Sequence, residues 1–497
     1  MFNIHTELLN KMKKTVVIGS GFSSLSSACY MAKAGYDVSI YEKNKEIGGR
    51  AREFRVDGFR FDMGPSWYWM PDVFESFFAD FGKEVKDYYS LKRLSPSYRV
   101  VFGEDDYLDL PSDLSELYLL FESIEKGSSL SLKSFLNDAK FNYDVAINQI
   151  VHLPGHSPFE LVTFNTLTRI SQFFRNISSY VHKNFKNEKL RQILEFPVLF
   201  LGAKPENTPY FYCFMNFADL SLGTWYPEGG MYQVVKGMMT LAKELGVKFY
   251  SECEVEGFTF IDNTVCNVNL KDGRAISCDY VINGADYRHV EKLLPKKYQV
   301  YSDKYWDDRV MAPSALLFYI GLDKKVDHVL HHNLFFDADF KAHASEIYED
   351  KKWPSNPLFY ANFTSKTDSF DAPENSDTCF LLMPIAAGIE DSEAMREKYY
   401  GILMDRLEKH AGQKIREHVV YKRSFCVDDF KSEYNSFKGN AYGLANTLRQ
   451  TAFLKPKLKN NKLTNFYNTG QLTVPGPGVP PALISGKIVS KLIIGNS

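Results

Sequence analysis

Two glycines and an acid near the start of the chain have the spacing of a site that holds the phosphates of a dinucleotide. Gly19 would allow a tight turn, and Gly21 would let backbone N–H groups approach a pyrophosphate closely. Glu42 follows about 20 residues later, where a carboxylate can accept hydrogen bonds from a ribose hydroxyl. Ser24 stands where the usual pattern has a third glycine, and it is small enough to keep a helix close to a strand.

The surrounding residues predict the elements that such a site needs. Residues 15–18 form a short, apolar, β-branched run that is typical of a buried parallel strand. Apolar residues then recur at helical spacing over residues 25–32, Gly35 lies where that helix would end, and residues 37–41 predict the next strand. This order of elements favours a bound dinucleotide over an ordinary glycine loop.

A second glycine pair narrows the choice of dinucleotide. Gly48, Gly49 and Arg50 follow soon after Glu42, and the pattern resembles the second glycine motif of the FAD-dependent amine oxidase and phytoene desaturase superfamily. The glycines permit close approach of the backbone, and the guanidinium group of Arg50 can donate two hydrogen bonds to a pyrophosphate. The alternative interpretation is a glycine turn with a solvated arginine.

Two further stretches are expected to complete the same site. Residues 62–66 follow a hairpin predicted at residues 54–61, and they resemble the flavin-contacting turn of the phytoene desaturase family. Near the C-terminus, residues 465–468 predict a strand, and Pro480 or Pro481 can begin a helix without losing a hydrogen bond. The amino end of that helix could donate N–H groups to the flavin and stabilise its charge on reduction. The alternatives are a structural turn and a plain terminal helix.

Composition limits the class of protein. The 497 residues suffice for about three domain-sized units, and 59 basic against 61 acidic side chains give a net charge of −2. Since neither a basic field nor a nucleic-acid motif is present in the sequence, we expect no nucleic-acid partner. Seven scattered cysteines without a CxxC pair favour reduced thiols in a cytoplasm. No secretory signal, membrane-spanning run or metal site is expected from the sequence.

The chain predicts an α/β fold in which the cofactor domain is discontinuous. Residues 1–90, 219–300 and 426–497 are expected to form a Rossmann-like FAD-binding domain, because they carry the glycine turns and short strands. Residues 91–218 and 301–425 lack such patterns and predict an inserted α+β substrate domain, whose first part would be mostly helical.

Residues 159–191 have the composition of a helix at a lipid surface. They combine aromatic and aliphatic side chains with six basic and two acidic residues. Apolar aromatics beside a basic face favour a helix that lies on an anionic membrane. An amphipathic helix packed on the core of the substrate domain is an equal alternative.

Three regions of the chain together resemble one family. Residues 19–66, 225–235 and 469–487 are similar to the bacterial phytoene desaturases of carotenoid synthesis. The resemblance implies FAD, an elongated apolar tunnel and peripheral attachment to the inner face of the cytoplasmic membrane. The implied reaction converts phytoene to neurosporene or lycopene by hydride transfer to the flavin and loss of a proton, with quinone or oxygen as electron acceptor.

The resemblance also implies specific site residues. The expected FAD contacts are Gly19, Gly21, Phe22, Ser23, Glu42, Lys43, Gly49, Arg50, Gly64, Pro65, Ser66, Val255, Gly470, Gly478 and Val479. In the family, a short acidic-then-arginine patch in the helical region is a suggested acid–base site. Residues 187–191 match it only in part, because Asn187 stands where an aspartate would. Glu188 and Arg191 are therefore the catalytic candidates, and a surface ion pair is the alternative.

Other functions stay open at this point. A hydroxycarotenoid 3,4-desaturase, a dehydrosqualene desaturase or a carotenoid isomerase would act on related apolar substrates. A flavin amine oxidase would need an amine-binding cage, for which the sequence offers no evident set of residues. A non-enzymatic prenyl or lipid carrier on the same fold, like the GDP-dissociation inhibitors, would not need the intact glycines and Arg50.

Overall fold

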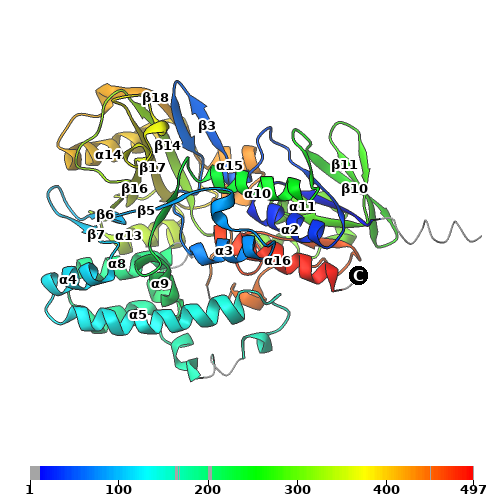
Figure 1. The fold of residues 1–497 in the computed structure, drawn as a ribbon, viewed down its shortest axis with the longest axis horizontal. Coiled ribbons are helices and arrows are strands. Elements are labelled where there is room, and N and C mark those ends of the chain that lie inside the picture. The colour runs from blue at the N-terminus through cyan, green and yellow to red at the C-terminus, as the bar shows by residue number, and fades with distance from the viewer. Residues whose placement is uncertain (1–11, 163–165, 167, 200–203, 448, 496–497) are drawn as a thin grey trace, which may run out of the picture.

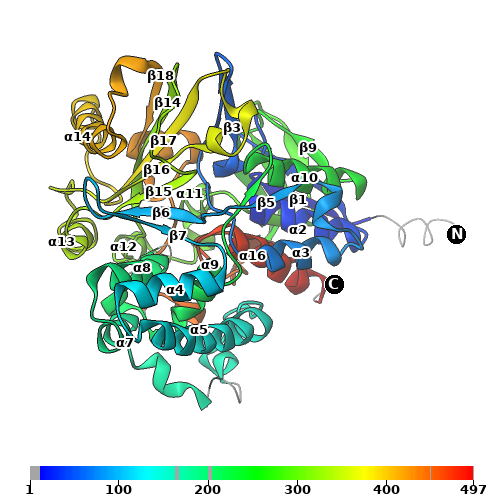
Figure 2. The ribbon, with the colours of Figure 1, turned by 60° about the vertical axis from the view of Figure 1, so that its left-hand side comes forward.

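The computed structural model describes residues 12–162, 166, 168–199, 204–447 and 449–495. Its elements form three regions (Figure 1). One region is a parallel sheet with its helices, the second is a larger sheet covered by a long helix, and the third is a group of helices. The same three regions stay separate when the molecule is turned (Figure 2).

The first region is built on a five-stranded parallel sheet that draws on distant parts of the chain. Its strand order is β19 (Phe466–Asn468), β13 (Tyr280–Asn283), β1 (Lys14–Ile18), β2 (Asp37–Tyr41) and β9 (Lys248–Tyr250). Its helices are α2 (Phe22–Lys33), α3 (Pro71–Ala79), α10 (Tyr232–Glu244), α11 (Tyr287–Leu293) and α16 (Val479–Ile494). A small sheet of β10 (Val255–Ile261), β11 (Thr264–Leu270) and β12 (Ala275–Ser277) lies beside them. The predicted α/β fold is confirmed, and the strands of this sheet come from three separate segments of the chain.

Helices α2 and α16 come from opposite ends of the chain and lie side by side (Figure 1). Their backbones approach closely because Gly486 has no side chain, and a β-carbon there would overlap the carbonyl oxygen of Ser23. Ser26 Oγ donates to Leu483 O at 2.7 Å, and Ser490 Oγ donates to Ser27 O at 3.2 Å. These contacts hold the C-terminal helix next to the first glycine turn.

The second region is a seven-stranded sheet. Its order is β18 (Val419–Phe425), β14 (Ser314–Leu322), β17 (Asp377–Ile385), β16 (Phe359–Asn362), β15 (His332–Phe335), β6 (Tyr98–Val101) and β7 (Tyr107–Leu110). Strand β14 is buried along its whole length. Alternate residues such as Leu316 and Phe318 pack on helix α14 (Glu393–Ala411), while Leu317 and Tyr319 face the other core. Both faces are therefore covered, which explains its unbroken apolar sequence.

The third region is mostly helical, as predicted, with α4 (Leu114–Ile124), α5 (Ser128–Val145), α7 (Ile177–Asn184), α8 (Glu188–Leu199) and α9 (Phe214–Leu220). The strands β6 and β7 from the same part of the chain were not predicted, and they join the seven-stranded sheet. The remaining strands form the predicted hairpin β3 (Glu53–Val56) and β4 (Phe59–Asp62) and the pair β5 (Leu91–Arg93) and β8 (Trp225–Pro227). The remaining α-helices are α12 (Asp303–Asp307), α13 (Phe340–Ser345) and α15 (Val427–Tyr434).

Residues 159–191 do not form one helix, so the prediction of a single amphipathic helix is wrong. Short turns at Pro158–Leu161 and Ile170–Phe173 precede α7 and α8. The side chain of Asn176 accepts a hydrogen bond from Ser179 N at 2.7 Å and so starts α7 afresh. Residues 163–165 and 167 lie outside the described residues. Among the described helices, none has both the length and the apolar content to cross a membrane.

Candidate functional site

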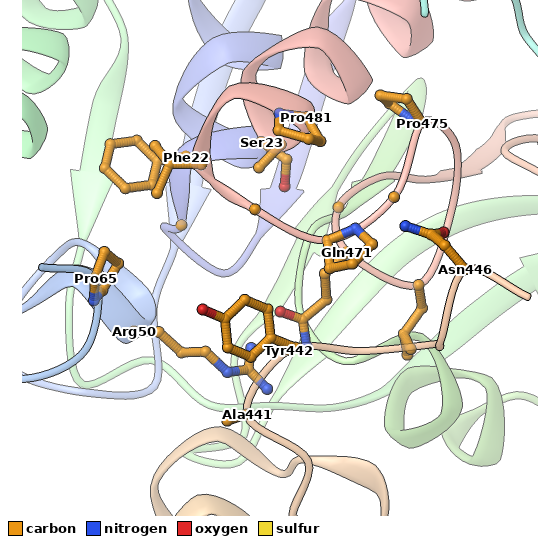
Figure 3. A pocket seen from close by; sticks show the side chains of 18 of the residues that line it. Phe22, Ser23, Arg50, Pro65, Ala441, Tyr442, Asn446, Gln471, Pro475 and Pro481 are labelled. Atoms are coloured by element: carbon orange, nitrogen blue, oxygen red, sulfur yellow. The ribbon is translucent and has the colours of Figure 1, made fainter. Parts of the chain in front are cut away.

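A cavity of about 800 Å³ joins all three regions. One end is lined by residues 18–23, 48–50 and 469–482, which come from the start and the end of the chain. Figure 3 shows Phe22 on one side of this space, Arg50 reaching into it, and Gln471 and Pro475 across from them. All residues expected to contact FAD line this cavity, from Gly19 at the first turn to Val479 at the start of α16. Their contact with a bound FAD stays a prediction.

The two glycines of the first turn have different roles. Gly19 has φ of +82°, and a β-carbon on it would lie 3.2 Å from Ala285 N, so the fold itself requires glycine there. Gly21 has an ordinary φ of −70°. A β-carbon on Gly21 would meet no atom within 4 Å. The space in front of Gly21 is therefore open at the amino end of α2, where backbone N–H groups favour a phosphate.

Glu42 directly follows strand β2 at the cavity wall and is buried. Its Oε2 accepts hydrogen bonds from Ser20 N at 3.0 Å and Ser20 Oγ at 2.6 Å, and its Oε1 accepts one from Asn44 N at 2.9 Å. A carboxylate can accept about four hydrogen bonds, so one position on Oε1 stays available for a ribose hydroxyl.

The second glycine turn packs directly on the first. Gly49 has φ of +58°, and a β-carbon on it would lie 3.2 Å from Gly21 Cα. Arg50 then reaches the cavity, where its Nη2 donates to Ser436 Oγ at 3.0 Å. Its Nε is buried and has no hydrogen-bond partner among the described residues. Burial lowers the pKa of Arg50, and the nearby carboxyl of Asp286 opposes this effect. A buried guanidinium with a free donor suits a pyrophosphate.

The turn at residues 62–66 is held against Arg50. A β-carbon on Gly64 would lie only 2.6 Å from Arg50 O, so this contact also requires glycine. Tyr319 OH donates to Met63 O at 2.6 Å, and the carboxylate of Asp62 accepts from Met231 N at 3.0 Å. The turn is thus tied to β14 and α10, and Pro65 is presented to the cavity.

Close packing of helix α2 on the sheet depends on one more glycine. The sequence assigned this role to the small side chain of Ser24. In the structure Ser24 is fully buried, and a β-carbon on Gly284 at the end of β13 would overlap its Oγ. Gly284 also lines the cavity. Its position directly after the short apolar run at residues 280–283 was the available signal.

Beyond these turns the cavity wall is mostly apolar, with Glu160 and His343 among its few polar residues. Its aromatic lining includes Trp67, Trp69, Phe196, Phe211, Phe336 and Phe340. Trp67 stacks on His332, with ring centroids 4.1 Å apart, and His332 Nδ1 lies 2.6 Å from Tyr360 OH. Burial holds the pKa of His332 well below its usual value, so the ring is neutral. This end of the cavity therefore presents hydrocarbon surface with little charge.

Several lining residues were missed by the sequence analysis. Tyr442, Asn446 and Gln471 surround the same space as Arg50 (Figure 3). Tyr442 and Asn446 belong to an irregular stretch with no motif, and only the fold brings them to the cavity. Asp286 also lines it, and its carboxylate caps α11 by accepting from His289 N at 3.0 Å.

The two catalytic candidates lie elsewhere. Glu188 and Arg191 are on helix α8, and Arg191 Nη1 lies 3.2 Å from Glu188 Oε2. The side chain of Glu188 is 61% exposed, and neither residue lines the cavity. The structure therefore gives them the geometry of a surface ion pair, which was the alternative interpretation of residues 187–191.

Comparison with known proteins identifies relatives over nearly the whole length. The family model of flavin containing amine oxidoreductases matches residues 22–494. The chain is 40% identical to the carotenoid 3,4-desaturase of Haloarcula japonica, over 96% of this chain and 97% of that protein. It is 32% identical to a 4,4'-diapophytoene desaturase of Staphylococcus aureus, over 96% and 97%. It is 29% identical to a zeta-carotene-forming phytoene desaturase of Myxococcus xanthus, over 97% and 94%.

Solved structures share the fold at low sequence identity. An oxidoreductase from Methanosarcina mazei has a TM-score of 0.63 at 16% identity, covering 95% of this chain and 99% of that chain. A Rab GDI from Plasmodium falciparum has a TM-score of 0.56 at 11% identity, covering 98% of each chain. Because both an oxidoreductase and a Rab GDI have this fold, the fold alone does not decide the function.

Proposed function

The chain belongs to the flavin-containing amine oxidoreductase family, and within it to the carotenoid desaturases, and on this premise we propose that it uses FAD to desaturate a long carotenoid polyene such as phytoene. Membership makes it an FAD-dependent oxidoreductase that acts on CH–CH bonds. The observation that carries the proposal is the continuity of the cavity. The part of the cavity lined by the glycine turns and Arg50, which we call the cradle, has the features of a dinucleotide site. It opens directly into the part with the aromatic wall, which we call the slot and which is lined by Trp67, Trp69, Phe196, Phe211, Phe336 and Phe340.

The residues of the chain have separate tasks in this reaction. The glycine turns and Arg50 would hold the pyrophosphate, and the amino end of α16 would face the flavin ring. The aromatic wall would position a substrate that has no polar group, by apolar burial alone, and would keep water away. When bound, FAD supplies the acceptor for a hydride from an allylic carbon, while the neighbouring carbon loses a proton and quinone or oxygen finally takes the two electrons.

The direct test is expression in a bacterial host that accumulates phytoene. We expect the pigments neurosporene or lycopene to replace phytoene, and the purified protein to be yellow with bound flavin. The matched control is Gly21→Val, which should leave phytoene unchanged. If the protein carries FAD and the host still contains only phytoene, phytoene is not its substrate.

A second candidate reaction has its own support. The identity to the 3,4-desaturase is 40%, against 32% and 29% to the two relatives named for diapophytoene and phytoene. We therefore also test a host that accumulates a hydroxylated acyclic carotenoid. A new double bond at C3–C4 in that host, with phytoene unchanged in the other, would assign the chain to 3,4-desaturation.

We also propose that the helical region contacts the inner face of the cytoplasmic membrane. Phe159 and Phe174 are 82% and 84% exposed, and both lie beside lining residues of the cavity, Glu160 and Phe173. Exposed aromatic side chains next to basic residues such as Arg175 favour an anionic lipid surface. An apolar substrate could then pass from the membrane to the slot without crossing water.

Flotation with vesicles that contain anionic lipid tests this contact. The double variant Phe159→Ser and Phe174→Ser should lose most of its vesicle binding, and high salt should weaken binding of the unchanged protein. Phe370→Ser is the control, because Phe370 is 86% exposed but lies in the seven-stranded region. Equal flotation of all three proteins would contradict the proposed contact.

A further inference from the structure

Two buried polar groups lie beside the cofactor cradle, Lys455 and Asn446. Lys455 is 2% exposed and Asn446 is 6% exposed. Neither Lys455 Nζ nor Asn446 Oδ1 has a hydrogen-bond partner among the described residues. Both side chains lie against Gly476, where a β-carbon would be 3.4 Å from Lys455 Cε and 3.3 Å from Asn446 Oδ1. Gly476 and Asn446 line the cavity (Figure 3 labels Asn446).

Burying a lysine without a partner is costly. Removing an ammonium group from water costs several kcal/mol unless an opposite charge or hydrogen bonds replace the water. Burial lowers the pKa of Lys455 to about 7, and no acid among the described residues opposes that effect. The described residues therefore supply no counter-charge, and a bound molecule would be a further source.

The neighbouring helix adds a second positive feature. Helix α16 has 16 residues and begins after Gly478, two positions beyond Gly476. Its amino end carries partial positive charge, and Pro480 and Pro481 have no N–H group to offer. The Lys455 side chain and this helix end therefore both lie near the short loop at residues 476–478, where an anion would favour the protonated lysine.

The chemistry of this pair points to the flavin ring and away from phosphate. The phosphates are expected at Gly21 and Arg50, where the glycine turns and a free guanidinium donor meet. Asn446 Oδ1 requires a hydrogen-bond donor, and a phosphate diester has none. The pyrimidine edge of a flavin carries an N–H group flanked by two carbonyl oxygens, and it becomes negatively charged when the ring is reduced.

We propose that Lys455 is a positioning residue that stabilises the negative charge which bound FAD gains on reduction, acting from behind Gly476 while Asn446 accepts from the flavin N–H. The proposal rests on the proposed function, because it requires FAD in this cavity. It predicts that Lys455 raises the reduction potential of the cofactor.

The test compares variants of the full-length protein loaded with FAD. The midpoint potential is measured anaerobically against a reference dye for the unchanged protein, Lys455→Met, Lys455→Gln and Lys455→Arg. In the two neutral variants, we expect the equilibrium constant for reduction of the bound FAD to fall about tenfold. This change lowers the midpoint potential by about 30 mV for a two-electron couple. In Lys455→Arg, the same equilibrium constant should stay within about threefold of that of the unchanged protein, because arginine keeps the positive charge. Sulfite, which forms an anionic adduct with flavins, should bind about tenfold more weakly to both neutral variants.

Lys459→Met is the matched control. Lys459 belongs to the same segment and is exposed, so its loss removes an equal charge without emptying a buried site. FAD content and melting temperature are measured for every variant. If Lys455→Met or Lys455→Gln carries full FAD and keeps the potential and sulfite affinity of the unchanged protein, the proposal is overturned. The pigment assay is independent, so a shifted potential without pigment would reject the proposed function and keep this inference.

Discussion

The glycine cradle and the aromatic slot share one cavity but are built in opposite ways. In the cradle, function depends on backbone geometry, and glycines at 19, 49 and 64 are required by positive φ or by contacts that leave no room for a β-carbon. In the slot, function depends on side chains that several elements contribute, and Trp67, Phe196 and Phe336 come from three different parts of the chain.

This difference determines how each part tolerates change. A backbone position that requires glycine tolerates no other residue, so any substitution there disturbs the local structure. An apolar wall accepts many combinations of similar volume, so substitutions there alter shape before they abolish binding. Substitutions in the cradle should therefore abolish FAD binding instead of weakening it gradually. Substitutions in the slot should change which substrates bind, according to the shape of each substrate.

The largest expected effect comes from Gly21→Val. Because a β-carbon at position 21 meets no atom within 4 Å, we expect the fold to keep its melting temperature. The same side chain would occupy the space expected for the pyrophosphate, so FAD affinity should fall by at least about 100-fold, or about 2.8 kcal/mol. Titration of the FAD-free protein measures this change. A yellow variant with normal affinity would show that the phosphates lie elsewhere.

The slot should respond to Ala344→Trp without any change in FAD content. Ala344 lies on α13 and lines the apolar part of the cavity. A large side chain there would shorten the space for a long polyene, and turnover of phytoene should fall by about tenfold or more. Ala344→Ser is the control of similar size. If the Trp variant converts phytoene at the normal rate, the substrate does not use this part of the cavity.

Lys455 should give the FAD-free protein a pH dependence that Lys455→Met lacks. Its pKa is about 7 in the folded chain and about 10.4 when unfolded. Between these values the unfolded chain binds the extra proton, so the free energy of unfolding should rise with pH by up to about 1.4 kcal/mol per unit. Denaturant unfolding at pH 7, 8 and 9 measures both slopes. Parallel slopes in the two proteins would show that Lys455 is not buried as a neutral amine.

The smallest effect is expected from Glu188→Gln. The carboxylate is mostly exposed and its partner Arg191 does not reach the cavity. We expect kcat to change by less than about twofold, equal to about 0.4 kcal/mol of activation free energy. Turnover with saturating FAD is the measurement. A loss of 100-fold would restore the acid–base role that the family resemblance implies.

Much of the cradle was predictable because its requirements are local. Gly19, Gly21 and Glu42 belong to one strand–helix–strand unit, and its spacing is readable within about 30 residues. The strand before α16 and the helix start at the prolines were predictable for the same reason. Gly284 was overlooked because its partner, Ser24, is distant in sequence.

The slot and the helical region were predictable only in outline. Residues 159–191 looked like one amphipathic helix, but the cap at Asn176 interrupts it. Composition indicated an apolar cavity without indicating which residues line it. The strands β6 and β7 were missed because their partners lie in another part of the chain.

Taken alone, the order of residues determined the family, the cofactor class and the turns that would hold its phosphates, since these depend on short-range backbone geometry. Tertiary structure alone decided which aromatic side chains meet in the slot and that Glu188 and Arg191 lie outside it. It also decided that Lys455 is buried with no hydrogen-bond partner for its Nζ among the described residues. Burial and long-range contacts arise from the packing of distant segments, and no local pattern encodes them.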